Sequence, residues 1–471
     1  MEIILNPLLY NPPKLFNTYL PPFPINFNAK FRFILDILAT LLFFNLDISP
    51  VSILIRCLLD SENKQVIVLG AGVAGLTAAL EIARCHISVE LVEKKLFLGG
   101  HAVHFACKAI NACVSCGACI VEDKLKAARS HPLIRITPNS RLAGVFGSSR
   151  LIADIENGPE YIAAEKCTRC GVCIQKCPHP GAIRPGFSSS DPPFISETCL
   201  YVKNQSCTLC QDSCPSAAIN LQRQGSRQQL TTDAVVIATG FHAFNPKDKP
   251  YGYGRFSDVV TSLDLERILK RQGVVKRPSD GTFPQKIAFI QCVGSRDLKQ
   301  NHLWCSRVCC ASGLRMAMLI KKRQPRAQVS FFYIDIQTFG SNFQLYYREL
   351  PQHMDLIRAI PGDIMKTEDN HLRLLFFDNR SRRQLEDTFD LVVLSVGIMP
   401  GKGTDELAKL LHLNLAETGF FPLPDSPVNA ADKNIFFAGS ACGPMNIAET
   451  VVHATQTAWR TVRFVKGEKN G

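Results

Sequence analysis

The chain has 471 residues, 46% of them hydrophobic, which is enough to bury the cores of two or three domains. Its 53 lysines and arginines exceed its 41 aspartates and glutamates, giving a formal charge of +12. Such a charge suggests nucleic acid or an anionic membrane as a partner, but no run of five or more basic residues occurs. We therefore predict no nucleic-acid partner.

Residues 1–63 differ in composition from the rest of the chain. The apolar stretch 31–44 is interrupted by Asp36 and is shorter than the roughly twenty residues that span a bilayer. It is not followed by the small-residue cleavage site of a signal peptide. We expect an N-terminal extension that is poorly ordered or that results from a mis-set start; a membrane-surface anchor is the alternative.

A dinucleotide-binding pattern occupies residues 64–106. The apolar strand 66–69 precedes Gly70-Ala71-Gly72-Val73-Ala74-Gly75, a helical segment at 76–83 and a second strand at 89–93. The three glycines, Gly70, Gly72 and Gly75, let backbone N–H groups and the helix N-terminus approach a diphosphate. Glu93 is placed to accept a hydrogen bond from a ribose hydroxyl. This stretch predicts the first part of an FAD-binding domain.

Cysteine is the most informative residue type, because all but three of the 19 cysteines fall into four groups of four. Strand–helix alternation breaks down between residues 107 and 225, where the first three groups lie. They are Cys107, Cys113, Cys116 and Cys119; Cys167, Cys170, Cys173 and Cys177; and Cys199, Cys207, Cys210 and Cys214. A [4Fe–4S] cluster needs four converging thiolates, and the second group, C-x2-C-x2-C-x3-C followed by proline, has the bacterial ferredoxin spacing. We expect residues 107–225 to be an inserted ferredoxin-like region.

Zinc, disulfides and scattered core thiols are the alternatives to iron. Zinc sites usually include histidine, and disulfides suit small secreted chains. The second and third groups therefore predict two clusters, whereas the first group could hold a further cluster or only structural thiols. Clusters in all four groups and a bound diphosphate would reduce the charge of the loaded protein to roughly +2.

The α/β pattern resumes after the cysteine-rich region. Residues 226–282 are expected to form the second part of the FAD-binding domain, because the apolar strand at 233–237 runs into Ala238-Thr239-Gly240, as in reductases with two dinucleotide domains. Residues 389–471 are expected to form the third part. There, the segment ending at Gly439, with a helix at about 448–465, resembles the segment that lies along the flavin's ribityl chain.

Residues 283–388 predict a second dinucleotide-type domain that has lost its nicotinamide motif. After the strand at 286–290 comes Gln291-Cys292-Val293-Gly294-Ser295-Arg296 in place of a glycine-rich turn. The fourth cysteine group begins there and consists of Cys292, Cys305, Cys309 and Cys310. Spacing alone leaves open whether these residues bind a cluster or are buried thiols or a redox disulfide.

Taken together, these motifs resemble the A subunit of heterodisulfide reductase over about residues 64–465. The most specific matches are residues 291–297, 305–310, 333–335 and 439–444. Residues 277–281, Arg-Pro-Ser-Asp-Gly, are closer to a short branch of that family, the A subunit of the quinone-interacting membrane-bound oxidoreductase. The resemblance implies a thioredoxin-reductase-like fold that holds FAD, and a cluster bound by the fourth cysteine group.

We accordingly predict an α/β protein with two dinucleotide-binding, thioredoxin-reductase-like domains and an inserted ferredoxin-like [4Fe–4S] module. Its expected function is that of an FAD and [4Fe–4S] electron-transfer subunit of a heterodisulfide-reductase-like complex, splitting two-electron flavin chemistry into one-electron steps. The expected FAD-binding residues are Gly70, Gly72, Gly75, Glu93, Gly240 and Gly439, and two to four clusters are expected. No separate catalytic residue is expected, and His101, His104 and His453 are interpreted as surface or packing residues.

The expected partners are the other subunits of the complex and a ferredoxin-like or quinone-linked electron carrier. The expected location is the cytoplasm, including attachment to the inner membrane face through partner subunits. One alternative is a self-sufficient NAD(P)H-dependent iron–sulfur flavoprotein, which would need a second glycine-rich turn near residue 291. The other is a zinc-stapled scaffold without enzymatic activity.

Overall fold

The structure is a computed structural model that describes residues 64–147, 150–186, 192–337, 348–379, 381–423 and 434–467. All of them belong to one compact unit, Ser61–Gly471. The prediction for residues 1–63 lies outside the described residues. None of the helices in the described part of the chain combines the length and hydrophobicity needed to cross a membrane.

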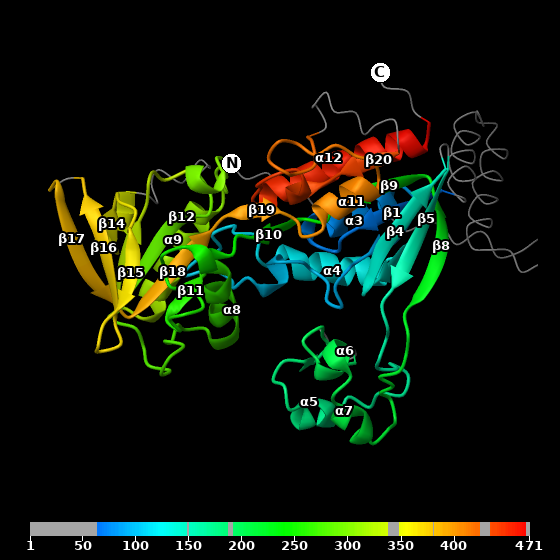
Figure 1. Ribbon diagram of the computed structural model, residues 1–471. Helices are drawn as coiled ribbons and strands as arrows, with labels where there is room; N and C mark the ends of the chain where they lie inside the picture. Colours follow the sequence, from blue (N-terminus) through cyan, green and yellow to red (C-terminus); the bar gives the residue numbers. More distant parts are fainter. Residues whose placement is uncertain are drawn as a thin grey trace, which may run out of the picture. The chain divides into compact units, whose positions relative to one another are not determined.

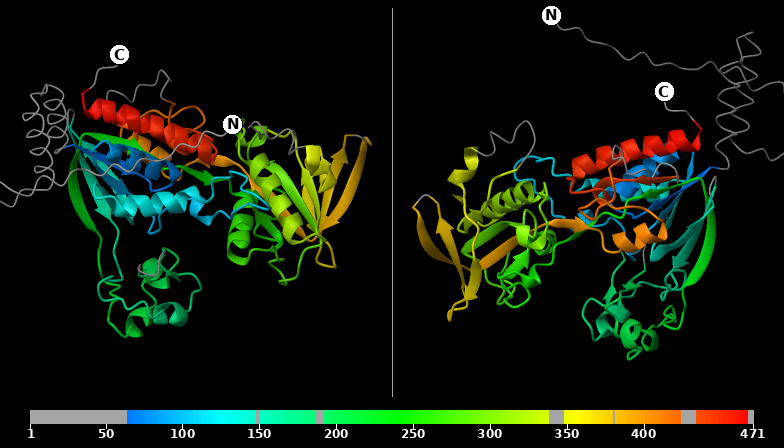
Figure 2. Two further views of the ribbon diagram at one scale, coloured as in Figure 1. Left: turned by 180° about the vertical axis from the view of Figure 1, so that it is seen from behind. Right: turned by 45° about the horizontal axis from the view of Figure 1, so that its top comes forward.

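The first domain is built on a parallel five-stranded sheet in the order β20-β9-β1-β2-β3 (Figure 1). Its strands are β1 (Gln65–Leu69), β2 (Ser88–Val92), β3 (Ile134–Thr137), β9 (Ala234–Ile237) and β20 (Ile435–Phe437). Its helices are α3 (Val73–Arg84), α4 (Ile120–Ser130) and α12 (Ile447–Val465). Buried alanines on α3 and α12, such as Ala78 and Ala458, let the two helices pack closely, and both views in Figure 2 show the red α12 against the blue α3.

Residues 120–137 belong to this first domain, so the predicted boundary at residue 107 is wrong. β3 pairs in parallel with β2, from Val89↔Ile134 to Val92↔Thr137, and α4 packs on α3. The loop that carries the first cysteine group separates β2 from α4, and this long interruption hides the strand–helix alternation. The antiparallel strands β4 (Ser140–Phe146), β5 (Leu151–Asn157) and β8 (Ser226–Thr232) follow, and the inserted region lies between β5 and β8.

The second domain has a parallel five-stranded sheet in the order β11-β18-β12-β13-β14. Its strands are β11 (Val259–Thr261), β12 (Lys286–Val293), β13 (Gln328–Phe332), β14 (Asp355–Ile357) and β18 (Leu391–Val396). Its helices are α8 (Ser262–Gln272) and α9 (Cys309–Arg323). An antiparallel sheet of β15 (Asp363–Lys366), β16 (Leu372–Asp378) and β17 (Arg383–Phe389) packs against it through Phe332, Phe376 and Phe389.

Two further predicted boundaries are wrong, because β11, α8 and β18 belong to the second domain. Residues 226–282 and 389–471 are predicted to be FAD-binding throughout, yet β18 pairs in parallel with both β11 and β12. A buried strand followed by a glycine, as β18 is by Gly397, is compatible with either sheet, so the sequence does not identify its neighbours. The short antiparallel strands β10 (Phe241–Ala243) and β19 (Ile398–Pro400) connect the two domains, and α11 (Thr404–Leu410) follows β19.

The inserted region has a small core of its own, to which cysteines contribute. It contains β6 (Ile183–Arg184), β7 (Phe194–Ile195), α5 (Val172–Lys176), α6 (Leu200–Asn204) and α7 (Leu209–Asp212). Buried Cys173, Cys199 and Cys210 pack there with Ile183 and Ile219. These elements are very short, so side-chain packing rather than helix or strand length must hold the region together.

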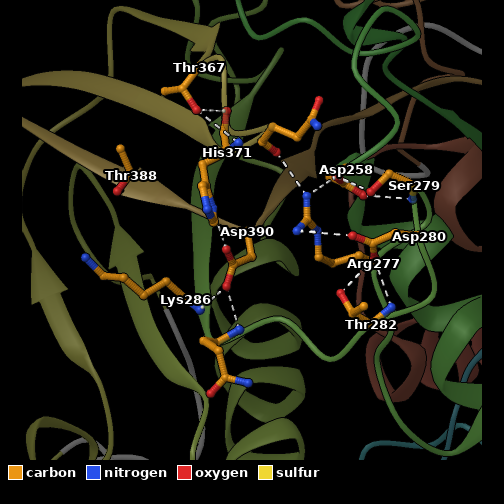
Figure 3. Close-up of polar contacts among 12 residues, drawn as sticks. Asp258, Arg277, Ser279, Asp280, Thr282, Lys286, Thr367, His371, Thr388 and Asp390 are labelled. Carbon is orange, nitrogen blue, oxygen red and sulfur yellow. Dashed lines mark hydrogen bonds and ion pairs between the residues drawn. The ribbon is translucent and has the colours of Figure 1, made fainter.

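Polar side chains link the outer segments of the second domain (Figure 3). The buried Asp258 accepts hydrogen bonds from Arg277 Nη2 at 3.1 Å and from the Ser279 hydroxyl at 2.7 Å. Arg277 also donates to the carbonyl oxygen of Asn370, in the turn between β15 and β16, at 3.0 Å. Residues 277–281, which carry the resemblance to the short branch, therefore fasten β11, the loop before β12 and the β15–β16 turn to one another.

Candidate functional site

The glycine turn between β1 and α3 closes on itself. Gly70 has a φ of +101°, and a Cβ at Gly75 would lie 1.7 Å from the Gly70 oxygen, so no larger residue fits there. A Cβ at Gly72 would meet only the Gly100 Cα, at 3.9 Å. Gly72 is thus the position at which the N-terminus of α3 remains open to a ligand.

Glu93 follows β2 and holds the glycine turn through its carboxylate. Its Oε2 accepts from the Ala71 N–H at 2.7 Å, and its Oε1 accepts from the Lys95 N–H at 2.9 Å. Burial raises the pKa of Glu93, and these two hydrogen bonds oppose the rise. Each carboxylate oxygen has a second lone pair, so the contacts leave capacity for a ribose hydroxyl.

Gly439, after β20, comes close to the start of α3. It has a φ of +66°, and a Cβ there would lie 2.5 Å from the Ala74 Cβ. Its N–H donates to His453 Nδ1 at 2.9 Å, so the proton of the neutral ring must be on Nε2. That Nε2 is buried without a hydrogen-bond partner in the described part of the chain. Burial lowers the pKa of His453, which favours the neutral ring.

These residues fit a bound dinucleotide. The turn from Gly70 to Gly75, Glu93 and Gly439 converge on the N-terminal end of α3. Gly240 has a φ of +70°, and a Cβ there would have no atom of the described residues within 4 Å. The orphaned N–H of His453 is a donor that a ligand could satisfy. The sequence alone favours a packing role for His453, and only its contact with Gly439 reveals the unpaired donor.

Four cysteines line one cavity in the inserted region, but they are not the four of one sequence group. The cavity is bounded by Cys167, Cys170 and Cys173 of the second group and by Cys214 of the third, together with Pro193 and Pro215. Cys177, the last cysteine of the second group, is absent from this lining. In two-cluster ferredoxins the fourth cysteine of each run binds the other cluster, and this arrangement fits that exchange.

Two buried thiols of the inserted region, Cys210 and Cys173, are hard to ionise without a cation. Burial, with nearby Cys199 and Cys207, raises the pKa of Cys210 to about 11. Burial likewise raises the pKa of Cys173. Thiolates at these positions would need compensating positive charge, which a metal centre supplies.

In the described residues no group of three or more His, Cys, Asp or Glu side chains is close enough to surround a single metal ion. The four thiolates that bind a cube of four irons lie farther apart than the ligands of a single ion. Cysteines spaced for a cluster therefore do not form a group of this kind. The fit of the inserted region to a cluster therefore rests on the four-cysteine cavity.

The first cysteine group is the least enclosed. Cys107, Cys113 and Cys119 are exposed and Cys116 is half-buried. No buried core in the described residues contains them.

The fourth group lies at the carboxyl end of β12, where parallel sheets commonly bind ligands. Cys292, Cys309 and Cys310 form a buried cluster, and Cys305 is half-buried. A hydrogen bond from the Cys309 side chain lowers the pKa of Cys310 to about 7. Cys292 has a left-handed φ of +60°, which is costly for a residue other than glycine and is typical of functional positions.

The turn after β12 offers no room for a diphosphate. A Cβ at Gly294 would lie 2.1 Å from the Phe244 ring, so this ring covers the turn. Nearby, Gln291 Oε1 and Ser295 Oγ are buried without hydrogen-bond partners in the described residues. Sequence reasoning does not single out either residue, because an unsatisfied polar atom is visible only after the chain folds.

Comparisons with known proteins show which chains this protein resembles. Residues 65–125 match the family described as FAD binding domain. The chain is 31% identical to the A subunit of the H(2):CoB-CoM heterodisulfide,ferredoxin reductase of Methanothermobacter marburgensis, covering 87% of this chain and 65% of that relative. It is 33% identical to the iron-sulfur A subunit of the CoB–CoM heterodisulfide reductase of Methanocaldococcus jannaschii, covering 84% of this chain and 63% of the relative. The chain thus spans less than two thirds of the length of these relatives.

A crystal structure of thioredoxin reductase from Lactococcus lactis aligns with a TM-score of 0.50, covering 86% of this chain and all of that chain, at 15% identity. At this identity the likeness concerns the fold. It confirms the predicted α/β fold with two dinucleotide-binding domains.

Proposed function

Because the chain is homologous to the A subunits of heterodisulfide reductase over 87% of its own length, we propose that it is an FAD-dependent iron–sulfur oxidoreductase. Its role is that of an electron-transfer subunit in a heterodisulfide-reductase-like complex. The observation that carries this proposal is the four-cysteine cavity of Cys167, Cys170, Cys173 and Cys214, on a chain that also has an open glycine turn at Gly72.

The glycine turn and its surroundings would hold FAD. Backbone N–H groups of the Gly70–Gly75 turn would hold the diphosphate, Glu93 would accept from the ribose, and Gly240 and Gly439 would let the chain pass close to the rest of the molecule. His453, with its proton on Nε2, would donate to a ligand atom as a neutral ring. Bound FAD exchanges two electrons, whereas each cluster exchanges one.

Two clusters are assigned to the inserted region. One is held by Cys167, Cys170, Cys173 and Cys214, and the other by Cys199, Cys207, Cys210 and Cys177. The fourth group would hold a further cluster at the carboxyl end of β12, and the first group is the candidate for a fourth. Six of the thiols in the second, third and fourth groups are buried, which limits their contact with water: Cys173, Cys199, Cys210, Cys292, Cys309 and Cys310.

The partners that fit this function are the other subunits of the complex and a ferredoxin-like or quinone-linked carrier. A nicotinamide is not expected to be the donor, because the Phe244 ring covers the turn at Gly294. The proposed location is the cytoplasm, with any membrane attachment made through partner subunits.

Cofactor content tests this proposal. Anaerobically prepared protein should contain about one FAD and at least about eight irons per chain. One-electron donors should bleach the flavin absorbance near 450 nm, while NADH and NADPH alone should leave it unchanged. Iron near four per chain, or zinc in place of iron, would contradict the two-cluster assignment, and rapid bleaching by NADH would favour the self-sufficient reductase.

A further inference from the structure

The first turn of α12 contacts the loops of two cysteine groups. Gly117, between Cys116 and Cys119, has a φ of +75°, and a Cβ there would lie 2.8 Å from Ile447 Cγ2. Two residues further along the helix, Glu449 Oε1 pairs with Arg307 Nη2 at 2.6 Å. The loops that carry the first and the fourth cysteine groups therefore both contact the first turn of α12.

Arg307 contacts a cysteine sulfur as well as the helix. Its backbone N–H lies 3.3 Å from Cys305 Sγ and donates to it, while its guanidinium pairs with Glu449. Its φ of +60° is in the left-handed region, which costs free energy for a residue with a Cβ. A charge-assisted hydrogen bond to a fixed carboxylate can hold the backbone in that conformation.

Glu449 is fixed independently of Arg307. Its Oε2 accepts from the Asn446 N–H at 3.0 Å, and its own N–H donates to Asn446 Oδ1 at 2.9 Å, which together form a capping box. Its other oxygen, Oε1, faces Arg307. Cγ2 of the next residue, Thr450, would lie 3.1 Å from a Cβ at Gly439. The same turn of α12 therefore also lies beside Gly439, one of the residues expected to bind FAD.

We propose that Arg307 is a positioning residue that couples the fourth cysteine group to the flavin-side helix. The inference rests on the proposed function, in which Cys305 binds a cluster and FAD lies near Gly439. A hydrogen bond to a ligating sulfur stabilises the extra negative charge of the reduced cluster and therefore raises its reduction potential. The Arg307–Glu449 pair holds the donor at Cys305 in place, so the position of α12 and the potential of that cluster are linked.

The test measures the potential of the centre whose electron paramagnetic resonance signal is lost in Cys305→Ser. The variants are Arg307→Gln, Arg307→Lys, Glu449→Gln and the double variant Arg307→Gln/Glu449→Gln. Glutamine at 449 can keep the capping box through its amide oxygen, and it removes the charge and the acceptor that face Arg307. Arg141→Gln, which breaks the surface pair with Glu156 at 3.0 Å, is the matched control.

The single Gln variants should lower the potential of this centre by similar amounts while retaining FAD and iron. The double variant should lower the potential no further than either single variant, because the two residues act as a unit. Arg307→Lys keeps a positive charge and should lower the potential less than Arg307→Gln does. An unchanged potential in Arg307→Gln, or additive effects in the double variant, would overturn the coupling while leaving the proposed function intact. Equal iron content in Cys305→Ser and the unaltered chain would overturn the coupling and the proposed fourth-group cluster together.

Discussion

Gly72 and Gly75 are three residues apart, yet they are glycine for different reasons. A Cβ at Gly75 would collide with the Gly70 oxygen at 1.7 Å, so this glycine is required for the turn to form. Gly72 has a φ of −83° and a ψ of −171°, which other residues adopt readily, and a Cβ there would make only an ordinary contact with the Gly100 Cα at 3.9 Å. Nothing in the described fold itself requires glycine at position 72, which leaves ligand approach as the reason.

Gly72→Val should therefore fold and yet lack FAD. A β-branched side chain would occupy the space in front of the α3 N-terminus, where the diphosphate approaches the backbone. Absorbance at 450 nm, iron content and far-UV circular dichroism of the purified variant check this. Iron and circular dichroism should match the unaltered protein, and retention of stoichiometric flavin would show that the diphosphate lies elsewhere.

Residues that tertiary contacts single out cannot always be found from sequence, even where their neighbours can. The spacing of Cys292, Cys305, Cys309 and Cys310 is visible in the chain itself. Ser295 and Arg307 carry no such pattern. The Ser295 hydroxyl stands out only because it lacks a hydrogen-bond partner among the described residues, and Arg307 only because it contacts the distant Glu449. Hydrogen-bond satisfaction is a tertiary property, so a linear pattern does not encode it locally.

At the scale of elements, the sequence predicts local motifs well and strand partners poorly. The predictions of β1, α3 and β2 are confirmed, because the glycine turn ties a strand, a helix and the next strand into one short unit. The domain assignments of β3 and β18 are wrong, because a strand's neighbours depend on pairing with distant segments. The same limitation explains why Cys214, rather than Cys177, lines the cavity with Cys167, Cys170 and Cys173.

Double variants distinguish the two possible groupings of these cysteines. If Cys177 serves the third group, Cys177→Ser/Cys207→Ser should lose one centre, about four irons, as Cys207→Ser alone does. Cys177→Ser/Cys173→Ser should lose two centres. Iron analysis with spin quantitation after dithionite reduction measures both losses. If Cys177→Ser/Cys173→Ser instead loses one centre and Cys177→Ser/Cys207→Ser loses two, Cys177 binds with the rest of the second group, as the sequence spacing predicts.

At the scale of the whole molecule, the segment after β2 links global stability to pH. His104 packs edge-on against Phe97, and burial, with Arg267 nearby, lowers its pKa to about 4. An unfolded chain would bind this proton at about pH 6.5. Between these two pH values the unfolded chain binds a proton that the native state does not, so the free energy of unfolding falls as pH falls. The contribution of neutral His104 to this free energy is complete above about pH 6.5 and is lost progressively toward about pH 4.

His104→Gln should accordingly reduce the loss of stability between about pH 7 and about pH 5. Urea unfolding of the anaerobic holoprotein, followed by far-UV circular dichroism at both pH values, gives the difference in free energy of unfolding. His353→Gln, at an exposed position, is the control and should behave like the unaltered chain. Identical pH dependence in His104→Gln and the control would show that the neutral ring does not contribute.

The strand order of the first sheet also determines when the nucleotide-binding domain can be completed during synthesis. β1 ends at Leu69, but β9, its neighbour, is paired on its other side by β20, which begins at Ile435. The face of α3 that packs on α12 stays uncovered until residues beyond Ile447 have left the ribosome. The inserted region, with its separate cysteine core, emerges much earlier. If the inserted region binds metal as proposed, metal delivery can precede completion of the first sheet, and the chain exposes the α3 surface to chaperones until α12 is synthesised.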